Sequence, residues 1–370
     1  MTRAKEAAAE AVTAAAVPVD ASAAAAVAAA APAGTAEESS SSSGETGESK
    51  KLLSGCAAAV AQLPGAVQFA LAVVLSFALQ ELGRVVVGRA SEGEVGGILR
   101  EADSRMGRGG FVLVAWRLFT LVLGWLGDYD GYDLAALALL SHGPATFLVS
   151  VFYGIRTLIA GAYLAVEVVS AFVPFLLFRQ LSGAHSAAPG IPNRDIVVDR
   201  GIQALTSAQS ALVYSVVVFL AGRYLLPDVL VLYFEGIPTI TPAADAAFLG
   251  FGNATTQLFS LLFGLAARTF IFTPLVATAR TAEDERNAEF NPVSATLAQT
   301  VAWNLWGYTT RTKVSLVRTA VAMLVTAVGT YLDTALAIKG VEPYGAAVYA
   351  AVWVTAALVT GLSLRYVGSV

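Results

Sequence analysis

The sequence has few charged residues and almost no residues suited to metal or redox chemistry. Charged residues make up 14% of the 370 positions, whereas a soluble globular chain carries roughly a quarter. The single cysteine, Cys56, excludes a disulfide framework, a cysteine-type zinc site and a cysteine-held iron–sulfur cluster. The two histidines, His142 and His185, exclude a site built from several imidazoles. We therefore expect no metal and no cofactor.

The net charge and the motifs exclude further classes of function. The formal net charge is −4, which excludes a generally basic nucleic-acid binder. The sequence contains no nucleophile elbow and no phosphate-binding P-loop. We therefore expect neither enzymatic activity nor a nucleic-acid partner.

Apolar residues dominate what is present. They make up 56% of the chain, and the mean hydropathy is +0.67. Several apolar runs are long enough to cross about 30 Å of hydrocarbon. The sequence predicts an all-α integral membrane protein with spans near 65–83, 110–127, 147–178, 207–226, 256–278, 314–336 and 344–364. The third span is over-long, and a shorter apolar segment, 134–140, is predicted to be re-entrant or interfacial.

The first 63 residues differ in composition from the rest. They are rich in alanine and then in serine and acidic residues, and such a segment buries too little apolar surface to offset the entropy of ordering. We predict a disordered tail over 1–63 that offers a site for a protein partner, a membrane domain over 64–337, and a further span with a short tail over 338–370. A cleaved presequence is disfavoured because Glu6 and Glu10 follow the early basic residues Arg3 and Lys5.

The charges of the predicted loops alternate. Loops 84–109, 179–206 and 279–313 carry several arginines, whereas 128–145 and 227–255 carry acidic residues and no lysine or arginine. Because basic loops resist translocation, the three basic loops are predicted to share one face of the membrane. Seven spans then place the C-terminus on the face opposite the tail.

A unit of about one hundred residues is repeated in the predicted membrane domain. Pro174 and Pro274 lie one hundred residues apart near the ends of the third and fifth spans, and they are followed by Arg179 and Arg280. The matching place after the first span is 79–84, which contains Glu81 and Arg84. Each unit therefore consists of a span, a kink, an arginine, a basic loop and a second span.

This organisation resembles the mitochondrial carrier family over residues 65–336. That family has three such units, in which each odd helix ends in Pro-x-[Asp/Glu]-x-x-[Lys/Arg]. The chain departs from the pattern at Leu79, Leu176 and Val276, and Arg280 comes one residue late. The resemblance implies a six-helix, three-fold pseudo-symmetric bundle plus one extra C-terminal span. It also implies a mitochondrial membrane, with a peroxisomal or ER membrane as the alternative, and close packing at Gly161.

The resemblance further implies a gate that closes one side of the carrier. Its residues would be Glu81, Arg84, Pro174, Arg179, Pro274 and Arg280. Glu81 would pair with Arg179, and the other two arginines would lack partners from the ring, which is costly away from water. This excess of bases supports an alternative hypothesis, a non-transporting membrane scaffold or adaptor.

Charges inside apolar runs are the candidate site residues. Each would cost roughly 2.5–3.5 kcal/mol at the centre of a bilayer, so each should face a cavity, a partner or the interface. Those found are Arg117, Arg156, Glu167, Arg223, Arg268, Arg318 and Asp333. An arginine-rich lining predicts a small anionic substrate held by Arg117, Arg223 and Arg268, with Glu167 also in the site. The alternatives are arginines that extend to the interface, and an ion pair of Glu167 with Arg156, Arg117 or Arg268.

The remaining polar motifs have simple interpretations. His142 and His185 are predicted to lie in loops. The acidic segment 128–133 is predicted to be a solvated turn, with a cation site as the alternative. Asn253 begins a glycosylation sequon, which leads to a third hypothesis, a seven-span protein of the secretory pathway.

Overall fold

The computed structural model describes residues 63–91, 93–99, 108–244 and 252–369. The predicted tail lies outside the described residues apart from position 63. The chain from Cys56 onward forms one compact unit, and all that follows concerns this unit. Its described elements are helices, and extended pairing in the described ranges is limited to two isolated bridges, Leu99 with Ile338 and Phe234 with Val341.

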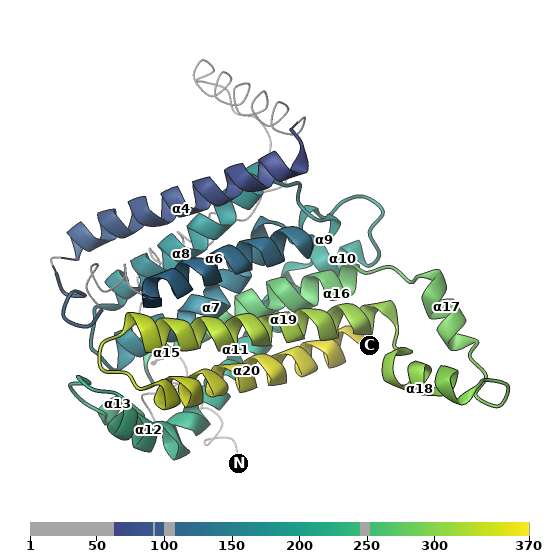
Figure 1. Ribbon diagram of the computed structural model, residues 1–370. Helices are drawn as coiled ribbons and strands as arrows, with labels where there is room; N and C mark the ends of the chain where they lie inside the picture. The colour runs from purple at the N-terminus through teal and green to yellow at the C-terminus, as the bar shows by residue number, and fades with distance from the viewer. Residues whose placement is uncertain (1–62, 92, 100–107, 245–251, 370) are drawn as a thin grey trace, which may run out of the picture. The chain divides into compact units, whose positions relative to one another are not determined.

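Eight helices in the described part are long and apolar enough to span a membrane. The protein is therefore an all-α multi-pass membrane protein, as the sequence predicts. The spans are α4 (Gly65–Ala90), α6 (Arg108–Leu126), α7 (Gly131–Val151), α8 (Thr157–Phe178), α11 (Arg200–Tyr224), α15 (Ala254–Ala267) with η1 (Arg268–Phe272) and α16 (Thr273–Ala277), α19 (Thr310–Leu332) with η2 (Asp333–Ala337), and α20 (Pro343–Ser369) (Figure 1).

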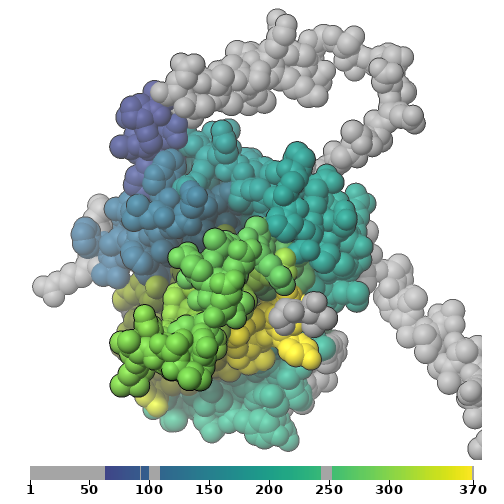
Figure 2. Space-filling model, turned by 90° about the vertical axis from the view of Figure 1, so that its right-hand side faces the viewer, coloured from purple at the N-terminus to yellow at the C-terminus, as the bar shows by residue number. Residues whose placement is uncertain are grey.

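Short helices occupy the connections between the spans. They are α9 (Gly183–Ser186), α10 (Arg194–Val198), α12 (Leu226–Tyr233), α13 (Thr241–Ala244), α17 (Ala282–Ala288) and α18 (Leu297–Trp306). Helices α17 and α18 project past the ends of the spans in Figure 1, and their green residues stand in front of the spans in Figure 2. Thr281 and Thr296 begin these two helices with capping boxes, which supply the backbone donors of the first turn with acceptors.

The prediction of seven spans was wrong by one, because α7 was missed. The predicted re-entrant segment 134–140 is the first half of α7, and the over-long span 147–178 is the end of α7 followed by α8. Gly154, with φ of +74°, lies in the connection between them. Pro144 lies inside α7 and breaks the sequence pattern of a helix. Helix α7 packs against α8, α15 and α19, so most of its residues are buried.

One extra span changes which loops share an end. At one end, Arg156 bonds to Glu94 at 3.1 Å, and the backbone N–H of Lys339 donates to the carbonyl of Ile98 at 3.0 Å. The connections 91–99, 152–156, 225–240 and 338–342 meet there, and we name this the Arg156 end. At the other, the His185 end, the connections 127–130, 179–199 and 278–309 meet. There His185 contacts Asp130 at 2.7 Å.

The predicted sidedness of the loops was therefore wrong. Loop 84–109 leads to the Arg156 end, whereas loops 179–206 and 279–313 lie at the His185 end. Arginines occur at both ends, so the charge bias that predicted the topology no longer separates them. Helix α4 begins, and α20 finishes, at the His185 end, because eight crossings return the chain to its starting side.

Helices α4 and α8 run antiparallel. A Cβ atom on Gly83 would meet Val166 at 2.7 Å, and one on Gly88 would meet the hydroxyl of Tyr163 at 3.6 Å, so residue numbers rise along α4 as they fall along α8. The carrier-like bundle needs the first and third predicted spans to run in parallel. Its three-fold pseudo-symmetry is not confirmed.

The core joins α7, α11, α15 and α20 through aromatic rings. The ring of Phe263 lies 4.7 Å from that of Trp353 and 5.3 Å from that of Tyr214. Gly264 lets α11 and α15 approach closely, since a Cβ there would lie 2.5 Å from the carbonyl oxygen of Ser207. Gly161, for which the resemblance implies close packing, has nothing within 4 Å of its Cβ position.

Candidate functional site

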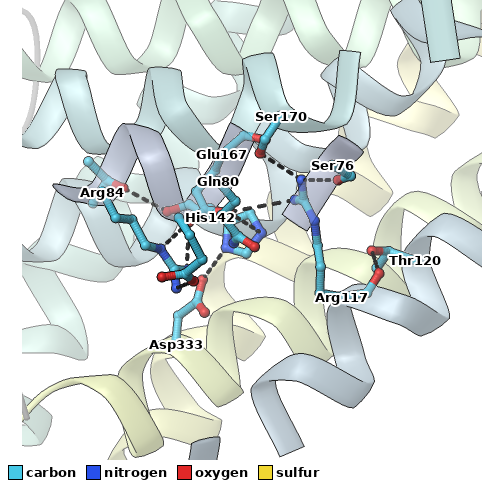
Figure 3. A network of polar contacts seen from close by, with 11 residues as sticks. Ser76, Gln80, Arg84, Arg117, Thr120, His142, Glu167, Ser170 and Asp333 are labelled. Atoms are coloured by element: carbon cyan, nitrogen blue, oxygen red, sulfur yellow. Dashed lines mark hydrogen bonds and ion pairs between the residues drawn. The ribbon is translucent and has the colours of Figure 1, made fainter. Parts of the chain in front are cut away.

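Five ionisable side chains meet inside the bundle, each from a different element. They are Arg84 of α4, Arg117 of α6, His142 of α7, Glu167 of α8 and Asp333 of η2 (Figure 3). All five lie in helices apolar enough to span a membrane. The tertiary packing of five segments distant in sequence therefore creates this network.

Glu167 is the hub of the network. Its carboxylate accepts hydrogen bonds from Arg84 Nη2 at 2.8 Å and from Gln80 Nε2 at 2.7 Å. Arg117 Nη1 lies 3.6 Å from the same carboxylate. The side chain of Glu167 is 12% exposed. Two guanidinium groups and one amide thus hold Glu167 as a carboxylate, because each favours the charged form.

Arg117 is the most deeply buried cation of the network, with 6% of its side chain exposed. Its Nη2 donates to the hydroxyls of Ser76 at 3.0 Å and Ser170 at 2.7 Å. These hydroxyls accept hydrogen bonds but carry no charge, so Glu167 is the nearest compensating anion. The Nε of Arg117 is buried and has no hydrogen-bond partner among the described residues.

His142 lies between the two carboxylates. Its Nδ1 is 2.6 Å from Asp333 Oδ2, and its Nε2 is 3.8 Å from Glu167 Oε2. Asp333 begins the π-helical turn η2, and such turns are frequent at functional sites in helices. The result is an acid–histidine–acid series within the membrane-spanning part of the bundle.

A cavity of about 180 Å³ contains these groups. All five ionisable residues and Gln80 line it. Its other walls are mainly apolar and include residues of the Arg156 end, namely Val95, Leu99, Ile155 and Ile338. The cavity therefore extends from the charged network to the loops of the Arg156 end, and it can hold a small polar solute and exchange a proton with His142.

The structure brings together some of the predicted substrate residues. Arg117 and Glu167 line the cavity, and Arg117 is one of the three partners predicted for Glu167. Arg223 is exposed in the last turn of α11, and Arg268 begins η1; neither lines the cavity. Arg156, another of the three predicted partners of Glu167, pairs with Glu94 instead.

The predicted gate residues do not meet in one ring. Arg84 joins the central network, and Glu81, 69% exposed, lies 3.5 Å from Arg84 and not beside Arg179. Arg179 pairs with Asp128 at the His185 end. Pro174 and Pro274 lie inside α8 and α16 near that same end, and Arg280 follows α16. Because α4 runs antiparallel to α8, Glu81 and Arg84 lie far from the predicted gate residues that follow α8 and α16.

Sequence reasoning missed His142 and gave Gln80 no role. His142 was predicted to lie in a loop because Gly143 and Pro144 follow it, yet it lies in the middle of α7. Asp333 was recognised only as a charge in an apolar run. The sequence did contain a signal for His142 and Asp333, since each is an ionisable residue inside an apolar span and such a residue needs a partner.

A second cluster lies at the His185 end and corrects the prediction of a solvated acidic turn for two of its three aspartates, whereas Asp128 is 91% exposed. Asp130 and Asp133 are buried, at 1% and 0% exposure. Arg318 donates to both oxygens of Asp133, at 2.6 and 3.2 Å, and its guanidinium lies 4.9 Å from the ring of Tyr129. His185 bonds to Asp130 at 2.7 Å, and lies on the short helix α9.

Protonation equilibria strengthen this second cluster. Burial alone would raise the pKa of Asp130, but its hydrogen bond with His185 and those from two backbone N–H groups hold that pKa below its usual range. Burial would lower the pKa of His185, yet the bond with Asp130 and the charge of Asp133 raise it. Ligand atoms of Asp130, Asp133 and His185 lie within 4.8 Å of one another. A metal ion would have to displace Arg318, so we interpret the cluster as a structural clamp.

No protein-family model, curated protein or solved structure matches the chain. The function is therefore inferred from the geometry of the central cavity.

Proposed function

We propose that this membrane protein transports a small anionic solute through the central cavity. The observation that carries the proposal is the group of five ionisable side chains around a cavity within apolar helices. A charged aspartate, lysine or arginine costs roughly 2.5–3.5 kcal/mol at the centre of a bilayer on insertion scales. Charged residues retained within membrane spans typically mark solute or ion pathways.

The preference for an anion comes from the arginines. Arg84 and Arg117 both line the cavity. A guanidinium has donors only, so a ligand that binds beside it must provide acceptor atoms. Planar oxyanions match the fork of a guanidinium better than neutral acceptors do.

The two ends of the bundle support alternating access. The cavity reaches the Arg156 end, while the clamp of Asp130, Asp133, His185 and Arg318 lies at the other end. Passage to the second side would require that clamp to separate. The π-helical turns η1 and η2 interrupt two of the spans that line this path, and they offer points at which a helix can bend.

Counterflow in proteoliposomes tests the proposal. Proteoliposomes that contain the purified full-length protein are preloaded with unlabelled lactate, succinate, phosphate or sulfate. Uptake of the matching radiolabelled anion is then measured. We expect uptake of at least one anion, and its loss in Arg117→Gln. Arg194→Gln, which changes an arginine at the His185 end, serves as the control. If protein-free liposomes or Arg117→Gln match the wild type for every anion, the protein is not such a transporter.

Arg268→Gln separates two hypotheses for the lining of the site. If the arginine-rich lining predicted from the sequence is correct, Arg268→Gln should abolish uptake, because Arg268 would bind the anion. A site confined to the cavity requires uptake to persist, because Arg268 lies outside it. The same assay decides between them.

A membrane adaptor is the second candidate function, and helix α18 supports it. Its apolar side chains are exposed, with Leu297 at 82%, Leu305 at 69% and Trp306 at 54%. An apolar face of this kind is typical of a surface that binds another molecule. If the protein is an adaptor, a pulldown of the wild type should recover a partner protein in stoichiometric amount. The double variant Leu297→Ser/Leu305→Ser should not recover that partner, and the wild type should transport no anion.

The family of the protein and the membrane in which it resides are proposed from the sequence alone. The spacing of Pro174 and Pro274 supports a relation to mitochondrial carriers and hence a mitochondrial membrane. A fluorescent fusion scored against mitochondrial, peroxisomal and ER markers tests the location. A deglycosylation shift that disappears in Asn253→Gln would instead indicate the secretory pathway.

A further inference from the structure

The position of His142 gives it a chemical property that no other residue of the network has. A neutral imidazole carries one N–H and one lone pair, whereas an imidazolium carries two N–H groups. One ring nitrogen of His142 faces Asp333 at 2.6 Å, and the other faces Glu167 at 3.8 Å. Ionised carboxylates only accept hydrogen bonds. Therefore only protonated His142 can donate a hydrogen bond to Asp333 and to Glu167 at the same time. The 3.8 Å contact with Glu167 can shorten to a hydrogen bond when His142 is protonated.

The two carboxylates are not equivalent. Glu167 already faces Arg84, Arg117 and Gln80. For Asp333, His142 is the hydrogen-bond partner found in the described ranges. An added proton is therefore held by the pair of His142 and Asp333, while Glu167 stays ionised against its two guanidinium groups.

The charges of the cavity give the consequence of protonation. Arg84 and Arg117 supply two positive charges to the cavity lining, and Glu167 and Asp333 supply two negative charges, so the lining is neutral when His142 is neutral. Glu81 also lies 3.5 Å from Arg84, but its side chain is 69% exposed and outside the cavity, where water screens its charge. Protonation leaves one excess positive charge in a cavity surrounded by apolar helices, where an unbalanced charge is unfavourable. A monovalent anion restores neutrality. Proton and anion thus favour each other's binding.

The cationic lining of the cavity consists of Arg84 and Arg117, and a guanidinium group only donates hydrogen bonds. A ligand bound beside these arginines must therefore provide acceptor atoms, and the two oxygens of a carboxylate match the fork of a guanidinium. The apolar walls, which include Val149, Ile155 and Ile338, suit a short carbon chain.

We propose that the cavity binds a small monocarboxylate together with one proton, which His142 takes up between Asp333 and Glu167, so that the protein is a proton–monocarboxylate symporter. This rests on the proposed transport function. The proton enters from the side to which the cavity is open, resides on the imidazole while the carboxylate is bound, and leaves with it. No covalent bond to the solute forms or breaks.

Binding and transport are measured separately, so that the two proposals can fail independently. Purified full-length protein in weakly buffered detergent solution is titrated with lactate, with butyrate and with the neutral analogue lactamide, and a pH indicator records proton uptake. At alkaline pH, where His142 is neutral before lactate binds, we expect about one proton taken up per lactate bound, an affinity that weakens about tenfold per pH unit, and no binding of lactamide.

Two variants and a matched control locate the proton. His142→Gln and Asp333→Asn should each remove the proton uptake and flatten the pH profile, and one suffices if the other does not fold. Asp195→Asn is the control, because Asp195 is exposed on the short helix α10 and lies outside the cavity and the clamp. It should keep both signals.

The outcomes separate the proposals. Lactate binding without proton uptake, or proton uptake that persists in His142→Gln, overturns the symport proposal. Failure of lactate and butyrate to bind while phosphate or sulfate is transported also overturns it and leaves the transport function standing. Proton-linked binding without uptake into proteoliposomes overturns transport, and symport with it, while the proton-linked binding site stands.

Discussion

Replacement of Glu167 by glutamine tests whether this carboxylate holds the intramembrane network together. The substitution keeps the shape of the side chain and removes the charge that faces Arg84 at 2.8 Å and Arg117 at 3.6 Å. Removal of one member of a buried ion pair typically costs 3–5 kcal/mol, because the remaining charge stays buried without compensation.

The expected magnitude follows from the exposure of the two arginines. Arg117 is 6% exposed and should contribute most of the penalty, whereas Arg84, at 36%, is partly screened by water. We therefore expect a loss of about 3 kcal/mol. A domain of 150–250 residues loses roughly 2–4 °C in Tm per kcal/mol and a larger one loses less, so the apparent Tm should fall by several degrees.

The assay is thermal unfolding of the purified protein in detergent at one fixed scan rate, since membrane proteins unfold irreversibly and the apparent Tm depends on the rate. Glu94→Gln is the control, because its partner Arg156 is 62% exposed and such surface pairs contribute about 1 kcal/mol or less. Arg117→Met/Glu167→Gln should recover part of the loss. An apparent Tm of Glu167→Gln equal to that of Glu94→Gln would refute the reasoning.

Three further predictions concern packing, protonation and topology. Gly264→Ala should destabilise the protein by about 1–3 kcal/mol, because its methyl group would press on α11, while Gly161→Ala, with open space around it, should not lower the apparent Tm. Because the folded pKa of His185 is raised, its stabilising contribution is complete below about pH 6.5 and is lost as pH rises through the raised value; the difference in Tm between wild type and His185→Gln should therefore shrink as pH increases, and a constant difference would contradict this. On a Cys56→Ser background, Gly97→Cys and Ser186→Cys should react with an impermeant maleimide from opposite sides of the membrane, whereas the seven-span prediction places both on one side.

Several features could be predicted from composition and local pattern. The apolar runs that became α4, α6, α11, α15, α19 and α20 were found because a span needs about 20 apolar residues, a property of each segment alone. Glu167 was recognised as a candidate site residue, because a carboxylate within such a run must have a partner. Arg117 was among the three partners named.

The errors arise where the environment of a segment decided its structure. Helix α7 contains His142, Gly143 and Pro144, which together resemble a turn. Packing against α8, α15 and α19 keeps it helical, because the surrounding helices exclude water from its backbone. Loss of that one span reversed the assigned direction of α8 and of every later span, so loop 84–109 was placed at the wrong end.

The sequence by itself determined that this chain is a multi-pass helical membrane protein and that a few charges must be buried in it, because hydropathy and the cost of a buried charge depend on segment composition. Only the tertiary structure decided which charges meet. Arg84, Arg117, His142, Glu167 and Asp333 come from five elements, and their pairing follows from the direction and packing of the helices. No local pattern encodes that arrangement, since it depends on contacts between residues as far apart in the chain as His142 and Asp333, which are separated by 191 positions.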